Sequence, residues 1–181
     1  MLKNNFHDDV WLMPYHEEWA HRFHISKQEI IGILLSVDIE CDVRHVGSTA
    51  IPGMISKPIV DVLVMVSPSD LENAMLALSE YMKCLGECGR PGRYFFSDGD
   101  TEQDAVYIHL TTPDNPVAVD QLRFLKLLQS TPELQRIYTF HKQLFAEHYP
   151  HDRTSYRAAK GVFIQELLAH AASNDDTSIE S

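Results

Sequence analysis

The stretch that most constrains the fold is residues 41–65, CDVRHVGSTAIPGMISKPIVDVLVM, in which two apolar runs flank a loop rich in glycine and hydroxyl side chains. The first run, 42–46, is short and β-branched. The second run, 58–66, is almost continuously apolar, as expected of a strand that is buried on both faces of a sheet. Its polar exception is Asp61. The stretch therefore predicts two strands joined by a loop, with one carboxylate in the second strand.

The loop between these strands carries residue types that suit the binding of an anion. Gly47 allows its backbone amide to come close to a ligand. Ser48 and Thr49 can cap a short helix whose first amides point at a phosphate, and Lys57 can neutralise its charge. We therefore expect this loop to bind a phosphate group.

The rest of the chain alternates between helical and strand patterns. Apolar residues three and four positions apart predict amphipathic helices over 16–37 and 71–83. Helices, strands and loops in this succession indicate an α/β (α+β) chain. The pattern from residue 117 onward is helical, with helices expected over 117–129, 132–148 and 154–172. We expect a single domain over 1–172, with a helical C-terminal part at about 117–172 and a disordered tail at 173–181.

The charge balance limits the kind of partner. The chain has 26 acidic and 15 basic residues, a formal net charge of -11, and no block of Lys or Arg. Binding to nucleic acid depends mainly on neutralising backbone phosphates, so no nucleic-acid partner is expected. A small phosphate ligand remains compatible, because a pocket can be locally positive on an acidic protein.

The apolar runs indicate where in the cell the protein is located, and the number and spacing of its cysteines indicate their redox state. No apolar run reaches the length of a membrane helix, and the N-terminus lacks the apolar region of a signal peptide, so we expect a cytoplasmic protein with no membrane partner. Cys41, Cys84 and Cys88 are odd in number and lack the spacing of a zinc site. We interpret them as reduced thiols. The sequence does not indicate the oligomeric state.

Two arginines flank a Pro-Gly turn and begin an aromatic run at residues 90–96, RPGRYFF. Arg90 and Arg93 could clamp a phosphate or carboxylate, or they could be the solvated arginines of a hairpin. The acidic run that follows, 97–104 (SDGDTEQD), lacks the spacing of a calcium loop, which favours a mobile hairpin tip over a cation site.

The next strand, 106–110, places a histidine among the candidates. Alternation puts Val106, Ile108 and Leu110 on one face and Tyr107 and His109 on the other. His109 is therefore a candidate site residue on the face opposite the apolar one.

Residues 45–53 (HVGSTAIPG) and 57–61 (KPIVD) together resemble the GrpB family of nucleotidyltransferase-like proteins. The resemblance extends over roughly residues 10–170. It implies a nucleotidyltransferase-like fold, a small mixed β-sheet flanked by helices with a C-terminal helical extension. It also implies a Gly-Ser pair that contacts a nucleoside triphosphate, and Asp-x-Asp carboxylates that hold a divalent metal, Mg²⁺ or Mn²⁺. Gly47 and Ser48 match the pair, and Asp61 matches the first carboxylate.

The sequence departs from the pattern of that family at two positions. Leu63 stands where the second carboxylate would share a strand face with Asp61. The resemblance also implies a further carboxylate from a later strand, and that position falls at or near His109, which is no carboxylate. Two-metal phosphoryl transfer needs several oxygen ligands, whereas one Asp with a His suits a softer ion. The alternative for Asp61 is a structural ion pair with Lys57 or Arg44.

Two hypotheses for function follow, and a third keeps only the fold. In the first, the protein is a nucleotidyltransferase with an unknown small acceptor, in which Asp61 and His109 are catalytic and bind metal. Its nucleotide would be held by residues of the loop and the turn, namely Gly47, Ser48, Thr49, Lys57, Arg90 and Arg93. In the second, Leu63 marks a degenerate nucleotide- or phosphate-binding module without chemistry. In the third, the protein is an interaction module.

Overall fold

The computed structural model describes residues 9–99 and 105–177, with side chains described as far as residue 171. The predicted hairpin tip therefore lies largely outside the described residues, as do the last four residues of the predicted tail. The chain packs as two compact units, one of residues Met13–Leu125 and the other of the residues up to Leu12 and from Lys126 onward. The single domain expected over 1–172 stays a prediction.

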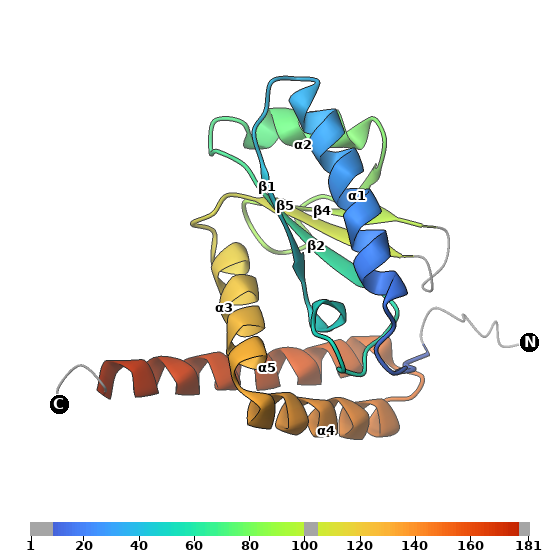
Figure 1. The fold of residues 1–181 in the computed structure, drawn as a ribbon, viewed down its shortest axis with the longest axis vertical. Coiled ribbons are helices and arrows are strands. Elements are labelled where there is room, and N and C mark those ends of the chain that lie inside the picture. Colours follow the sequence, from blue (N-terminus) through green and yellow to red (C-terminus); the bar gives the residue numbers. More distant parts are fainter. Residues whose placement is uncertain (1–8, 100–104, 178–181) are drawn as a thin grey trace, which may run out of the picture. The chain divides into compact units, whose positions relative to one another are not determined.

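Helices and strands alternate in the first unit, and helices dominate the second (Figure 1). The strands are β1 (Asp42–Val46), β2 (Val60–Met65), β3 (Lys83–Cys84), β4 (Arg93–Asp98) and β5 (Val106–Thr111). The helices are α1 (Glu18–Leu35), the short 3-10 helix η1 (Ser48–Ala50), α2 (Leu71–Ser79), α3 (Pro116–Ser130), α4 (Pro132–His148) and α5 (Arg153–Thr177).

The strands form one mixed sheet in the order β1-β2-β5-β4-β3. Strand β2 pairs antiparallel with β1 and parallel with β5, and β4 is antiparallel to both of its neighbours. The small mixed sheet with helices that the sequence predicts is confirmed. The parallel pairing of β2 and β5 brings together segments that are far apart in the chain, so it decides which side chains meet on the sheet.

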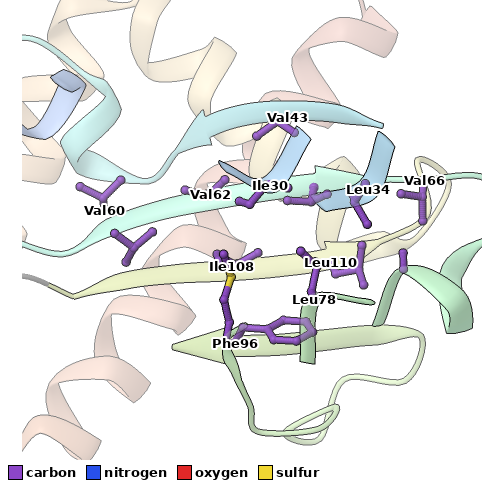
Figure 2. Close-up of a cluster of buried hydrophobic side chains, with 14 of the residues drawn as sticks. Ile30, Leu34, Val43, Val60, Val62, Val66, Leu78, Phe96, Ile108 and Leu110 are labelled. Carbon is purple, nitrogen blue, oxygen red and sulfur yellow. The ribbon is translucent and has the colours of Figure 1, made fainter. Parts of the chain in front are cut away.

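One face of the sheet carries the main hydrophobic core. Figure 2 shows side chains of neighbouring strands, among them Val43, Val62, Ile108 and Phe96, beside the helix side chains Ile30, Leu34 and Leu78. The helices α1 and α2 cover this face, and Trp19 of α1 is also buried there. The alternation predicted for β5 is confirmed, because Ile108 and Leu110 are fully buried while Tyr107 and His109 keep part of their surface exposed.

The opposite face of the sheet is partly covered by α3. Val46, Leu63 and Met65 form a second buried cluster with Ala118, against which other apolar residues of α3 pack. Strand β2 is therefore buried on both faces, which explains why its sequence is almost continuously apolar.

Two element boundaries differ from the prediction by four residues or more. The helix expected over 71–83 ends at Ser79, and Lys83 and Cys84 form β3, which pairs with β4. Pairing with a neighbouring strand overrides the local helical pattern here. Helix α5 continues to Thr177, so residues 173–177 of the predicted disordered tail are helical.

The second unit consists mainly of α4 and α5. Helix α4 begins at Pro132, as predicted, although Thr131 makes no side-chain capping bond. The backbone amide of Val10 donates to the carbonyl of Pro150, and His151 lies 2.7 Å from Asp9, so the start of the described chain is held against the turn between the two helices. Among the described helices, none combines the length and apolar character needed to cross a membrane.

Candidate functional site

The loop after β1 is in contact with the carboxylate on β2. Gly47 has φ +74° and ψ -173°, a conformation that is essentially restricted to glycine. A Cβ atom at this position would lie 2.6 Å from Oδ2 of Asp61. The strand pairing explains this closeness, because Val46 and Asp61 are register partners and Gly47 follows directly. Gly47 is therefore required both by its backbone conformation and by the carboxylate beside it.

The other oxygen of Asp61 faces His109. Oδ1 of Asp61 and Nε2 of His109 lie 3.4 Å apart, and the two side chains are 33% and 13% exposed. Nδ1 of His109 is buried and has no hydrogen-bond partner among the described residues. The neutral tautomer of His109 that forms a hydrogen bond here is therefore the one with its proton on Nε2, which donates to Oδ1 of Asp61. The structure brings together the two residues predicted to be catalytic and metal-binding.

Leu63 occupies the predicted position of the second carboxylate and has a packing role there. It lies on the same sheet face as Asp61, is the register partner of His109, and is fully buried against Ala118 of α3. An acidic side chain at this position would be placed in an apolar contact.

The donor set does not fit a two-ion centre. Asp61 and His109 supply two donors, and in the described part of the chain no three His, Cys, Asp or Glu residues are grouped to hold a metal ion. Two-ion phosphoryl transfer needs several carboxylate oxygens around both ions. The pair suits a single ion of the softer kind, such as Mn²⁺, with further ligands supplied by a phosphate and by water. A divalent metal stays a prediction.

The loop forms a short helix, a single 3-10 turn over Ser48–Ala50, but the predicted capping role is wrong: Ser48 and Thr49 lie inside the turn, Gly47 is at its N-cap position, and no side chain makes a capping bond. Thr49 is buried, and its Oγ1 lies 3.1 Å from Nε2 of His45. The His45 ring stacks on Phe23 of α1 at 4.7 Å between ring centroids. These contacts make Thr49 part of the support beneath the loop. Its predicted contact with a ligand stays a prediction, as does that of Ser48, which is buried in the same turn.

His45 is a supporting residue that the sequence reasoning missed. Burial lowers its pKa to about 4, although the negative charge of Asp61 acts in the opposite direction. His45 is therefore neutral near pH 7 and anchors the loop through its hydrogen bond to Thr49. The available signal was the place of His45 at the start of the 45–53 segment that resembles the GrpB family.

The predicted cations lie in different environments. Arg93 is 5% exposed and lies on the same sheet face as His109, with its Cζ atom 5.0 Å from the centre of the Phe95 ring. It is therefore not a solvated hairpin residue. Arg90 is exposed in the turn before β4, and Lys57 is half-buried just before β2. Arg44, the alternative partner for Asp61, bonds Asp42 at 2.7 Å.

Two aromatic residues beside His109 were not among the predicted site residues. Tyr107 is the register partner of Asp61, and Phe95 is that of His109. The alternation that singled out His109 also places Tyr107 on its face, so this signal was available for Tyr107.

Comparison with known proteins gives a consistent family. The model of the GrpB protein family matches residues 9–170. A Bacillus subtilis UPF0157 protein, YqkA, is 29% identical over 90% of this chain, which spans only 47% of YqkA. The glutamate-rich protein GrpB of Alkalihalophilus pseudofirmus is 28% identical, with 88% of this chain and 94% of that protein covered.

Solved structures agree with this result. The crystal structure of GrpB from Enterococcus faecalis has a TM-score of 0.77 and 26% identity, and the match covers 91% of this chain and 98% of that one. A chain of the GLD-2/RNP-8 complex matches with a TM-score of 0.50 and 14% identity over 74% of this chain and 44% of its own. That likeness shows the fold alone, and the nucleotidyltransferase-like fold that the sequence predicts is confirmed.

Proposed function

We propose, from the premise that this chain belongs to the GrpB family, that it binds a nucleoside triphosphate or a similar small phosphate ligand on the sheet face that holds Asp61. The observation that carries the proposal is the position of Asp61 between Gly47 and His109. One carboxylate oxygen faces a backbone that has no side chain, and the other faces an imidazole. A carboxylate, an imidazole and a glycine backbone that meet on one sheet face can together contact a small polar ligand.

The phosphate end of the ligand would lie at the loop. Gly47 adds no side chain of its own to the loop, where its nearest neighbour is the Asp61 carboxylate, and Ser48 follows with a hydroxyl. Arg93, on the same sheet face, and Lys57, at the start of β2, supply positive charge to a chain whose formal net charge is -11. Charge-assisted hydrogen bonds from such groups are the common means by which proteins hold phosphate.

When a divalent ion accompanies the phosphate, Asp61 would hold it, with His109 as the second donor. The ion would offset the repulsion between the Asp61 carboxylate and the phosphate oxygens. Every other part of the proposed binding depends on the backbone at Gly47 and on the cationic side chains.

Binding without nucleotidyl transfer is the form of the proposal that the site supports best. Leu63 is fully buried against α3, so the strand lacks the second carboxylate that holds two ions in phosphoryl transfer. Transfer of a nucleotidyl group to a small acceptor is the alternative. A cytoplasmic location is part of the proposal, since cells keep their nucleoside triphosphates there.

The test is isothermal titration calorimetry of the full chain with the four nucleoside triphosphates and with tripolyphosphate, each with and without Mg²⁺ or Mn²⁺. We expect saturable binding, and no pyrophosphate release when labelled nucleotide is incubated with a metabolite extract. Absence of binding by every one of these anions contradicts the proposal. Pyrophosphate release that disappears in Asp61→Asn would replace it with the transferase alternative.

A further inference from the structure

The half of the sheet face that belongs to β4 and β5 presents an aromatic patch, which consists of Phe95 and Tyr107. The two rings lie 5.2 Å apart at an angle of 67°. Both side chains are half-buried. Strand register places Tyr107 beside Asp61 and Phe95 beside His109, and the rings of Phe95 and His109 are 5.3 Å apart. The aromatic patch is therefore continuous with the Asp61–His109 pair.

The aromatic patch differs from the surfaces that build the core. On the reverse side of the same two strands, Phe96, Ile108 and Leu110 are fully buried in the main core. On the β1–β2 half of the face that holds Asp61, aliphatic residues pack against α3. The β4–β5 half instead combines rings with an imidazole and a guanidinium. Partly exposed aromatic side chains interleaved with a few polar groups are typical of ligand sites.

Arg93 limits the kind of ligand that suits the aromatic patch. Its guanidinium lies over the Phe95 ring, 5.0 Å from the centroid, and its side chain is held in a buried position. A guanidinium and an aromatic ring both present flat faces to a planar π-system, and the guanidinium also attracts negative charge. A planar ring that carries a phosphate group satisfies both of these preferences.

We infer that the aromatic patch stacks the planar ring of the bound ligand, the base of a nucleotide whose phosphates lie at Gly47. This inference rests on the proposed phosphate binding and adds the part of the site that distinguishes a nucleotide from a bare phosphate chain. Stacking on an aromatic side chain is tolerant of base identity because every base has a π-face. The ring contact should therefore raise affinity about tenfold for all four bases.

The experiment compares a nucleotide with the same phosphate chain lacking a base. Calorimetry would measure the Kd of ATP, GTP, CTP and UTP and that of tripolyphosphate, for the wild-type chain and for Phe95→Leu. The matched control is Phe140→Leu, the same substitution at a phenylalanine of α4 that is 57% exposed. We expect all four nucleotides to bind about tenfold more tightly than tripolyphosphate, a difference lost in Phe95→Leu and kept in Phe140→Leu.

The outcomes separate this inference from the proposal beneath it. Equal affinities of nucleotides and tripolyphosphate for the wild type would overturn the ring contact and leave phosphate binding intact. Failure of every anion to bind would overturn both. If Phe95→Leu does not fold, Phe95→Trp provides a second measurement, because a stacked base quenches tryptophan fluorescence. The inference is contradicted if ATP and tripolyphosphate both quench the fluorescence, or if neither of them does.

Discussion

Gly47 and Asp61 are in contact across the β1–β2 pair: a Cβ atom on Gly47 would lie 2.6 Å from Oδ2 of Asp61. The two residues come from the loop and from the strand that the sequence singled out for different reasons. Their contact means that the loop conformation and the carboxylate position are coupled. A change at either residue should therefore affect both stability and binding.

Replacing Gly47 with alanine should lower the free energy of unfolding by roughly 2 to 4 kcal/mol, because left-handed backbone strain and overpacking both oppose a side chain there. Urea denaturation would measure the change. Gly53→Ala is the matched control, since Gly53 has φ +81° but nothing within 4 Å of an added Cβ atom. It should show the strain alone, about 1 to 2 kcal/mol. Equal losses in the two variants would mean that the Asp61 contact has no energetic weight.

Asp61→Asn keeps the size of the side chain and removes its charge, so it tests the proposed ion contact. Without added metal, phosphate binding should tighten several-fold, because a negative charge beside the phosphates is gone. With Mg²⁺ or Mn²⁺, the gain in affinity seen in the wild type should disappear. Calorimetry would measure both effects. Asp42→Asn, on β1 with its carboxylate bonded to Arg44, is the control and should behave like the wild type. A metal-dependent gain that survives in Asp61→Asn contradicts the assignment.

Leu63→Asp should be destabilising and should create a metal response. A carboxylate at this fully buried position faces the apolar side of α3, which should cost several kcal/mol. Mn²⁺ should recover part of that loss by binding this carboxylate together with that of Asp61. Leu63→Ala, which should lose about 2 to 5 kcal/mol through a cavity, is the control without a new ligand. Thermal unfolding with and without Mn²⁺ would compare them, and an equal shift in the two variants would rule out a metal site at this strand.

Stability should fall in mild acid because of His45. Its pKa in the folded chain is about 4, against an ordinary value of 6.5. Above pH 6.5 the ring is neutral in both states and costs nothing. As the pH falls from 6.5 to 4, the unfolded chain binds a proton that the folded chain does not, so roughly 3 kcal/mol is lost.

Urea denaturation of the wild type and of His45→Gln at pH 7, 5 and 4 would isolate this contribution. The variant should be less stable at pH 7, because the stacking on Phe23 is lost, and its stability should change less between pH 7 and pH 4. Parallel pH profiles for the two proteins would show that His45 is not the residue responsible.

Much of the local structure could be predicted because its signals are local. Strand β1 spans the predicted residues 42–46, and α4 spans the predicted 132–148. Strand alternation correctly placed Asp61 and Leu63 on one face, since successive side chains of a strand point to opposite sides. Apart from the end of α5, the largest boundary error occurred at β3, where a two-residue strand depends on its pairing with β4. A pattern within one segment cannot contain that information.

The sequence by itself determined the anion-suited loop, the lone carboxylate behind it and the leucine two residues further on. Only the tertiary structure decided what these residues touch. The parallel pairing of β2 with β5 brings Asp61 to His109, 48 residues away, and α3 turns Leu63 into a packing residue. The same tertiary structure brings Thr49 within hydrogen-bonding distance of His45 and places the Arg93 guanidinium over the Phe95 ring. Periodicity along a chain determines which face a side chain takes, but the partner across that face depends on which strands and helices pack together.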